Sequence, residues 1–167
     1  MKKINIVLSA VLLISSVSGL ANTTINIVGK VVAIPCIVSE ETISKEVELP
    51  VTEARSMAEP GSGSGWVDFE LELDDCPFYL KKAIATFTGV PDKDDKTTFK
   101  NLGDAANVSL QMVAQSTTYG DASQMKVDIN SSTNKASFPL SARIYSAKGN
   151  AGKGTFNTIV GVSFTYQ

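Results

Sequence analysis

The 167-residue sequence contains no histidine and only two cysteines, and both shortages narrow its possible chemistry. Without histidine the chain lacks the usual general base near neutral pH, the Ser/His/Asp and Cys/His arrangements, and His-ligated zinc sites. No Cys-x-x-Cys pair occurs, which argues against a redox dithiol. Because no nucleophile–base pair can be nominated, the sequence predicts no enzyme, no cofactor and no metal site.

The sequence also has no large excess of charge of either sign, because it contains 15 Lys+Arg and 17 Asp+Glu, for a formal net charge of −2. Without Lys2 and Lys3 the balance becomes 13 against 17. Such a chain lacks the dense cationic footprint that nucleic acids and anionic membranes require. Hydrophobic residues make up 43% and charged residues 19%, so a chain of one-domain length can bury a core.

Long apolar runs are missing apart from one near the start of the chain. A basic start precedes an apolar run over residues 6–14, and Gly19 and Ala21 lie at −3 and −1 of a cleavage site before Asn22. The run is well short of the roughly 20 residues that span a bilayer. We therefore interpret residues 1–21 as a cleaved export signal rather than an anchor, and expect no direct membrane insertion.

The two cysteines, Cys36 and Cys76, are the only pair in a chain predicted to be exported. Export to an oxidising compartment favours one disulfide between them. A metal site would need at least two further ligands nearby, and histidine cannot supply them. We expect the bond to hold the first strand of the fold beside the second.

Apolar and polar residues alternate in four stretches with the two-residue period of half-buried strands. The stretches are residues 66–75, 108–112, 138–144 and 154–167. No stretch of helical length carries a capped apolar stripe, so we predict an all-β chain. About seven short strands in the mature chain are typical of an immunoglobulin-like sandwich. Turn-rich stretches predict loops at residues 59–65, 90–95 and 147–152.

Both ends of the mature chain carry an alternating segment. The last one reaches the final residue, and a sandwich that stops there can lack its closing strand, which leaves an apolar groove and an unsatisfied edge. Its apolar face is Phe156, Val160, Val162, Phe164 and Tyr166. The first segment precedes Cys36, and its face is Thr23, Ile25, Ile27, Gly29 and Val31. Periodicity alone leaves open whether this is a first core strand or an extension that pairs elsewhere.

At these residues the sequence resembles the pilin subunits of bacterial chaperone–usher fimbriae, and most closely a minor tip subunit. The segments that carry the resemblance are TINIVGKVVAIPCIVS, WVDFELELDDCP, FKNLGDAANVSLQ, FPL at residues 138–140 and GTFNTIVGVSFTYQ at the end. They follow one another in order along essentially the whole mature chain. The Gly154/Tyr166 pair, together with the Cys36/Cys76 spacing, is specific to the family.

The resemblance implies an incomplete immunoglobulin-like sandwich that lacks its last strand and is completed by a donated one. Residues 22–33 would be the donor-strand extension, and residues 34–167 the pilin domain. The strand from Gly154 to Tyr166 would line the groove that receives a strand, first from the chaperone and then from a neighbouring subunit. Thr23 stands where a more apolar residue is expected, so we expect that end of the donor to bind weakly.

The implied function is structural: a minor tip-adaptor subunit that polymerises by donor-strand exchange and links the tip adhesin to other subunits in cell adhesion. Its implied partners are neighbouring fimbrial subunits including a tip adhesin, a periplasmic chaperone and an outer-membrane usher. The implied route leads through the periplasm to the cell-surface fimbria. The alternatives are a major rod subunit, another minor pilin, or, less favoured, a carbohydrate-binding adhesin module. Adhesins of this family carry a lectin domain in addition to the pilin domain, and a chain of one-domain length has no room for it.

Overall fold

Two antiparallel β-sheets make up the folded body, residues 34–167, in a computed structural model that describes residues 26, 28–30 and 34–167. The strands are β1 (Ile37–Val38), β2 (Ser62–Gly63), β3 (Val67–Asp74), β4 (Lys82–Thr88), β5 (Phe99–Lys100), β6 (Ser109–Ala114), β7 (Thr117–Thr118), β8 (Gln124–Asp128), β9 (Ala136–Ser146) and β10 (Gly161–Tyr166). Two single-turn helices, α1 (Glu40–Ile43) and η1 (Ala54–Met57), complete the described elements. The all-β prediction is confirmed.

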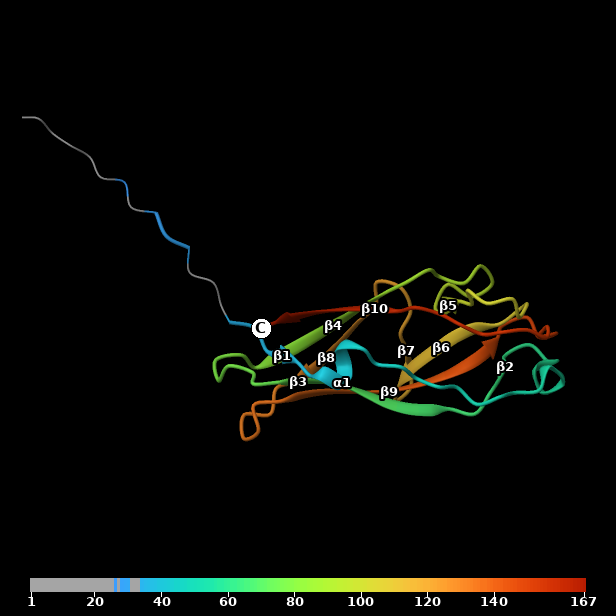
Figure 1. Ribbon diagram of the computed structural model, residues 1–167, viewed down its shortest axis with the longest axis horizontal. Coiled ribbons are helices and arrows are strands. Elements are labelled where there is room, and N and C mark those ends of the chain that lie inside the picture. Colours follow the sequence, from blue (N-terminus) through green and yellow to red (C-terminus); the bar gives the residue numbers. More distant parts are fainter. Residues whose placement is uncertain (1–25, 27, 31–33) are drawn as a thin grey trace, which may run out of the picture. The chain divides into compact units, whose positions relative to one another are not determined.

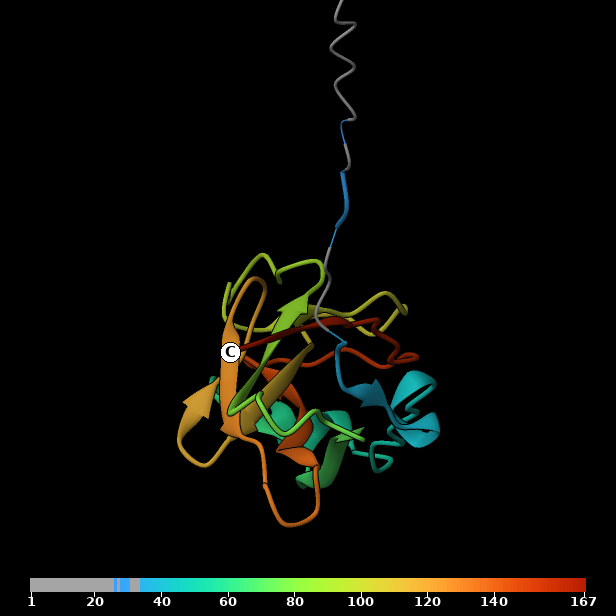
Figure 2. The ribbon, with the colours of Figure 1, turned by 90° about the vertical axis from the view of Figure 1, so that its left-hand side faces the viewer.

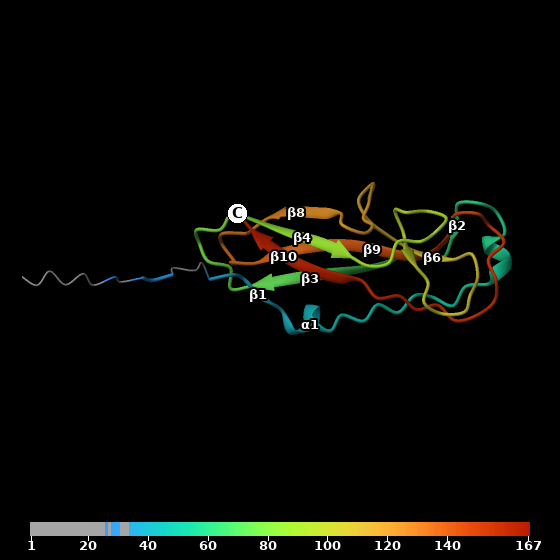
Figure 3. The same ribbon diagram turned by 90° about the horizontal axis from the view of Figure 1, so that it is seen from above.

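The larger sheet has the order β1-β3-β9-β6-β5, with β2 paired to β9 and β7 paired to β6, and the smaller has the order β10-β4-β8. Figure 1 shows β4 and β10 on one side of the body, with β3 and β9 on the other. Seen along the strands and from above, α1 and β8 lie at opposite edges (Figures 2 and 3). The core therefore fills the space between two stacked layers.

Alternation along the strands decides which side chains enter this core. In β3, Leu71 and Leu73 are buried whereas Glu70 is exposed, as the sequence pattern predicts. Leu71 stands opposite Phe138 of β9, so the two neighbouring strands deliver large side chains to the same layer. The smaller sheet supplies Phe87 of β4, which is fully buried. Aromatic and aliphatic side chains from both sheets therefore pack together in the core between them.

The predicted loop over residues 59–65 is wrong in part, because it contains β2. Ser62 and Gly63 pair with the end of β9, opposite Ser146 and Tyr145. Gly63 allows this close approach, since a Cβ at that position would lie 2.8 Å from the Ile144 carbonyl oxygen. A glycine-rich stretch that reads as a turn thus serves as a short edge strand.

The predicted C-terminal strand is shorter than expected, because β10 begins at Gly161 and not at Gly154. The segment between them binds a distant loop instead: Leu102 N–H donates to the Asn157 carbonyl at 2.6 Å, and Ala105 N–H donates to the Thr155 carbonyl at 3.1 Å. These bonds use the backbone groups that a longer strand would need for its ladder.

The predicted disulfide is present between Cys36 and Cys76, and both residues are buried. Cys36 immediately precedes β1, and Cys76 follows β3 by two residues. β1 pairs with β3 through Ile37 opposite Asp74 and Val38 opposite Leu73. The bond therefore holds the first strand, β1, beside β3, the first long strand of the larger sheet; the expectation of neighbouring first and second strands holds except that the short β2 comes between them in the chain.

Candidate functional site: an apolar groove beside β10

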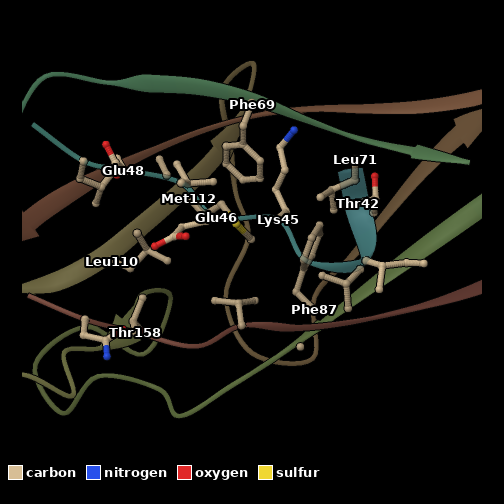
Figure 4. Close-up of a pocket in the computed structure, with 18 of the residues that line it drawn as sticks. Thr42, Lys45, Glu46, Glu48, Phe69, Leu71, Phe87, Leu110, Met112 and Thr158 are labelled. Carbon is tan, nitrogen blue, oxygen red and sulfur yellow. The ribbon is translucent and has the colours of Figure 1, made fainter. Parts of the chain in front are cut away.

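An apolar groove with a volume of about 960 Å³ opens between the two sheets on the side of β10. Its floor consists of core side chains from both sheets, including Phe69 and Leu71 of β3, Phe87 of β4 and Met112 of β6. Figure 4 shows these side chains around the open space. The floor of the groove is therefore part of the core-facing surface of the sheets, which at this place no described strand covers.

One wall of the groove is β10, which presents a free strand edge. Gln167 and Lys82 exchange both of their backbone hydrogen bonds, each at 2.9 Å. Because hydrogen-bonded pairs alternate in an antiparallel ladder, the N–H and C=O groups of Val162, Phe164 and Tyr166 point away from β4. Within the described residues no other strand pairs with this edge. The edge is therefore open to a further strand.

The opposite wall is the extended segment 44–50, between α1 and η1. In the described part of the chain, no backbone hydrogen bond joins it to a neighbouring strand. Val47 and Leu49 are half-buried, whereas the charged side chains at the rim are exposed, namely Lys45, Glu46 and Glu48. An extended guest lying between this segment and β10 would find backbone partners on both sides.

The groove face of β10 is only half-buried in this structure. Val162 and Phe164 both pack against the core and line the groove. The Phe164 ring also contacts Phe138, with ring centroids 5.5 Å apart. Full burial of an aliphatic or aromatic side chain releases about 1.5–3 kcal/mol. Covering this surface is therefore a substantial driving force for binding an apolar extended segment.

Tyr166 ends β10 and packs against the core without lining the groove. Partial burial raises the pKa of its phenol, so the side chain stays neutral near physiological pH. No residue of β10 carries a charge, and the charged lining side chains are those at the rim. The interior of the groove is thus suited to apolar side chains and a hydrogen-bonding backbone.

The structure brings together four of the six residues predicted for the groove strand. They are Phe156, Val160, Val162 and Phe164, which line the groove. Gly154 does not line it: its φ is +148°, and a Cβ there would lie 2.5 Å from the Ala105 backbone nitrogen. Its glycine requirement comes from this close approach to the loop around residue 105.

The predicted donor residues lie almost entirely outside the described residues. Gly29 is described and exposed, and no atom would lie within 4 Å of a Cβ placed on it. The other four, Thr23, Ile25, Ile27 and Val31, lie outside the described residues. Their role as a donor strand therefore stays a prediction.

Sequence reasoning missed the second wall and much of the floor. Residues 46–49 do alternate between acidic and apolar side chains, with Pro50 directly after them, and this short pattern is a local signal for the wall. The segment nevertheless forms no paired strand among the described residues. The alternation over residues 66–75 predicts that Phe69 and Leu71 face the core, but nothing local marks them as floor residues of a groove. These residues differ from the rest of the core only in that they line the open groove and no described strand packs over them there.

Other kinds of site find little support within the described residues. There, no group of three or more acidic or cysteine side chains is placed to hold a metal ion. None of the helices in this part of the chain is long and apolar enough to cross a membrane. The groove with its two unpaired backbone edges is the feature that a functional assignment has to explain.

Comparison with known proteins identifies the kind of chain that carries this groove. The family profile described as fimbrial protein matches residues 25–167. The chain belongs to the fimbrial protein family. This fimbrial subunit is 34% identical over 163 residues to protein FimG of Escherichia coli strain K12, covering 96% of this chain and 95% of FimG. It is 34% identical over 148 residues to the fimbrial-like protein YdeR of the same strain, covering 88% and 86%.

Solved structures support the fold of the subunit. The crystal structure of the P pilus rod subunit PapA superposes with a TM-score of 0.67 at 14% identity, covering 80% of this chain and 100% of PapA. A chaperone–usher pilus structure gives 0.67 at 15% identity, covering 92% and 100%. The predicted immunoglobulin-like pilin fold is confirmed. The chain is a structural subunit of chaperone–usher fimbriae, which are cell-surface fibres, and the family is not enzymatic.

Proposed function

We propose that this fimbrial subunit is a minor tip-adaptor pilin that polymerises by donor-strand exchange and links a tip adhesin to the subunits that follow. The observation that carries the proposal is the apolar groove between two unpaired backbone edges, β10 and residues 44–50. The 34% identity to FimG over 96% of the chain supports the minor-subunit role.

In this proposal residues 22–33 are the segment offered to a neighbour, after removal of the signal peptide at residues 1–21. Ile25, Ile27 and Val31 share one face of an extended chain. Each would contribute about 1.5–3 kcal/mol when buried in the neighbour's groove. Part of that energy offsets the ordering of the extension, and no nucleotide is required.

The groove has to be filled before and after assembly, because an open apolar groove with free strand edges is prone to aggregation. A periplasmic chaperone first lends a strand to the groove. An outer-membrane usher then exchanges it for the extension of the next subunit, during export through the periplasm to the cell surface. Each subunit gives a strand on one side and receives one on the other, so assembly is open-ended and yields a fibre.

A substitution in the extension separates donation from folding. Ile27→Asp in the full chain should leave the amount of chaperone-bound subunit unchanged, because the extension is outside the body. Incorporation into fimbriae should be lost, since an unpaired carboxylate would be buried in the acceptor. Asn26→Asp, with the same charge on the opposite face, is the matched control and should assemble normally. Quantitative immunoblots of chaperone complexes and of sheared fimbriae measure both steps.

A second pair of variants tests the accepting side. Val162 lines the groove, whereas the neighbouring Ser163 alternates to the outer face of β10. Val162→Asp should abolish capture by the chaperone, and Ser163→Asp should preserve it.

Unfolding of the chaperone-bound subunit by Ile27→Asp would show that the N-terminal segment belongs to its own core, which contradicts donor-strand exchange. Equal behaviour of the two β10 variants would contradict the accepting role of the groove.

The adaptor role has a separate readout. Fimbriae from the producing bacterium should contain this subunit in a small molar ratio to the most abundant pilin, measured by quantitative mass spectrometry. Deleting its gene should leave rods without their adhesin. A ratio equal to that of the most abundant pilin would instead identify a rod subunit.

A further inference from the structure

Three large apolar side chains form an exposed cluster where the body begins. Ile34 is 70% exposed, Phe78 82% and Tyr79 47%. The rings of Phe78 and Tyr79 meet edge to face, with centroids 5.6 Å apart. We call Ile34, Phe78 and Tyr79 the base patch. Single exposed apolar residues are ordinary, but a contiguous group held together in this way marks an interaction surface.

The base patch is held by specific bonds. The Tyr79 hydroxyl accepts a hydrogen bond from the Ile34 N–H at 3.1 Å and donates one to the Ile34 carbonyl at 3.2 Å. The Cys36–Cys76 disulfide joins the same two segments two or three residues away. Lys81 Nζ also donates to the Phe78 carbonyl at 3.0 Å. These contacts fix the backbone at both sides of the patch, so its shape is preorganised for a partner.

We propose that the base patch packs against the body of the neighbouring pilin that holds this chain's N-terminal extension, and so fixes the joint between the two subunits. The inference rests on the proposed donor role of residues 22–33. Ile34 directly follows that segment in the chain, and consecutive Cα atoms are 3.8 Å apart. Whichever groove holds the extension up to Ala33, the body around that groove must lie next to Ile34.

The chemistry of the patch indicates the kind of surface it fits. The matching surface has to be apolar and lie at the mouth of an acceptor groove. This chain shows how a pilin can provide one: Ile159 and Leu102 are 72% and 50% exposed near the start of β10. Leu102 lies beside the groove-lining Asn157, to whose carbonyl its N–H donates. A donor running antiparallel to β10 would emerge from the groove at this end.

Photocrosslinking in isolated fimbriae tests the contact directly. One form of the full chain carries benzoylphenylalanine in place of Phe78, a second in place of Ile27, and a third in place of Val51, which is fully exposed between α1 and η1. The producing bacterium assembles each form, and sheared fimbriae are irradiated and analysed by mass spectrometry. We expect the probes at 27 and 78 to trap the same pilin, and the probe at 51 to trap that pilin at least tenfold less often.

The outcomes separate this inference from the function on which it rests. No pilin adduct at position 27 would overturn donor-strand exchange itself. An adduct at 27 without one at 78, or adducts to two different subunits, would leave donation intact and overturn the base-patch contact. As a second measurement, Phe78→Ser should assemble but dissociate from its acceptor roughly tenfold faster in denaturant, because an interface aromatic is lost. Unchanged dissociation of this variant would also count against the contact.

Discussion

Replacing both bonded cysteines with alanine tests how far the subunit depends on its disulfide. The bond between Cys36 and Cys76 spans 40 residues. The chain-entropy relation for a loop of that length gives a loss of about 13 cal/mol/K from the unfolded chain, or about 4 kcal/mol at 25 °C. Alanine is chosen because both positions are buried, at 4% and 2% exposure, and serine would leave hydroxyls without partners.

The local structure suggests why this loss matters for the groove. β1 has only two residues paired with β3, and Val38 at its end lines the groove. Without the bond, β1 and the following α1 are held to β3 by that short pairing and by two hydrogen bonds with Glu72. The Ser39 N–H donates to the Glu72 carbonyl at 3.1 Å, and the Glu72 N–H donates to the Thr42 hydroxyl at 2.7 Å. We therefore expect the variant to lose both stability and capture by the chaperone.

Urea unfolding of the full chain, followed by circular dichroism, measures the effect. With a slope of about 2 kcal/mol/M, the loss of about 4 kcal/mol corresponds to a midpoint lowered by about 2 M. The matched control is the unchanged chain with its disulfide reduced, which should unfold within about 0.5 M of the Cys36→Ala/Cys76→Ala variant. An unchanged midpoint in the variant would refute the entropic reasoning. A large gap between the alanine variant and the reduced unchanged chain would point to packing of the sulfur atoms instead.

Two further predictions follow from contacts outside the groove. Gly154→Ala should destabilise the subunit by more than about 2 kcal/mol in urea unfolding, because φ is +148° and the Ala105 nitrogen is too close for a Cβ; Gly65→Ala, with open space around it, is the control and a similar loss there would contradict this. A hydrogen bond from the Lys148 ammonium lowers the pKa of the Asp94 carboxyl below its ordinary value of 3.8. The stabilising effect is therefore present above that ordinary value and is lost as the pH falls through the lowered pKa. Lys148→Gln should move the Asp94 pKa, followed by NMR titration, back toward its ordinary value, and an unmoved pKa would exclude the pair as its cause.

The sequence by itself determined the strand faces, the cysteine pair and the class of fold. In β3 and β9 the two-residue period assigned Leu71 and Phe138 to the core, and the structure confirms both. Such assignments succeed because the direction of a side chain from an extended backbone depends only on its immediate neighbours in the chain. The disulfide could also be predicted from the sequence, because two cysteines in a chain predicted to be exported allow a single intramolecular pairing.

Only the tertiary structure decided what surrounds the groove. It made residues 44–50 an unpaired wall, turned Gly154 away toward the loop near Ala105, and brought Ile34 to the Tyr79 hydroxyl 45 residues away. Each of these depends on contacts between segments distant in sequence, and no local period encodes them. A free edge is also a property of the whole sheet, because β10 becomes an edge only when no other described strand occupies the place beside it.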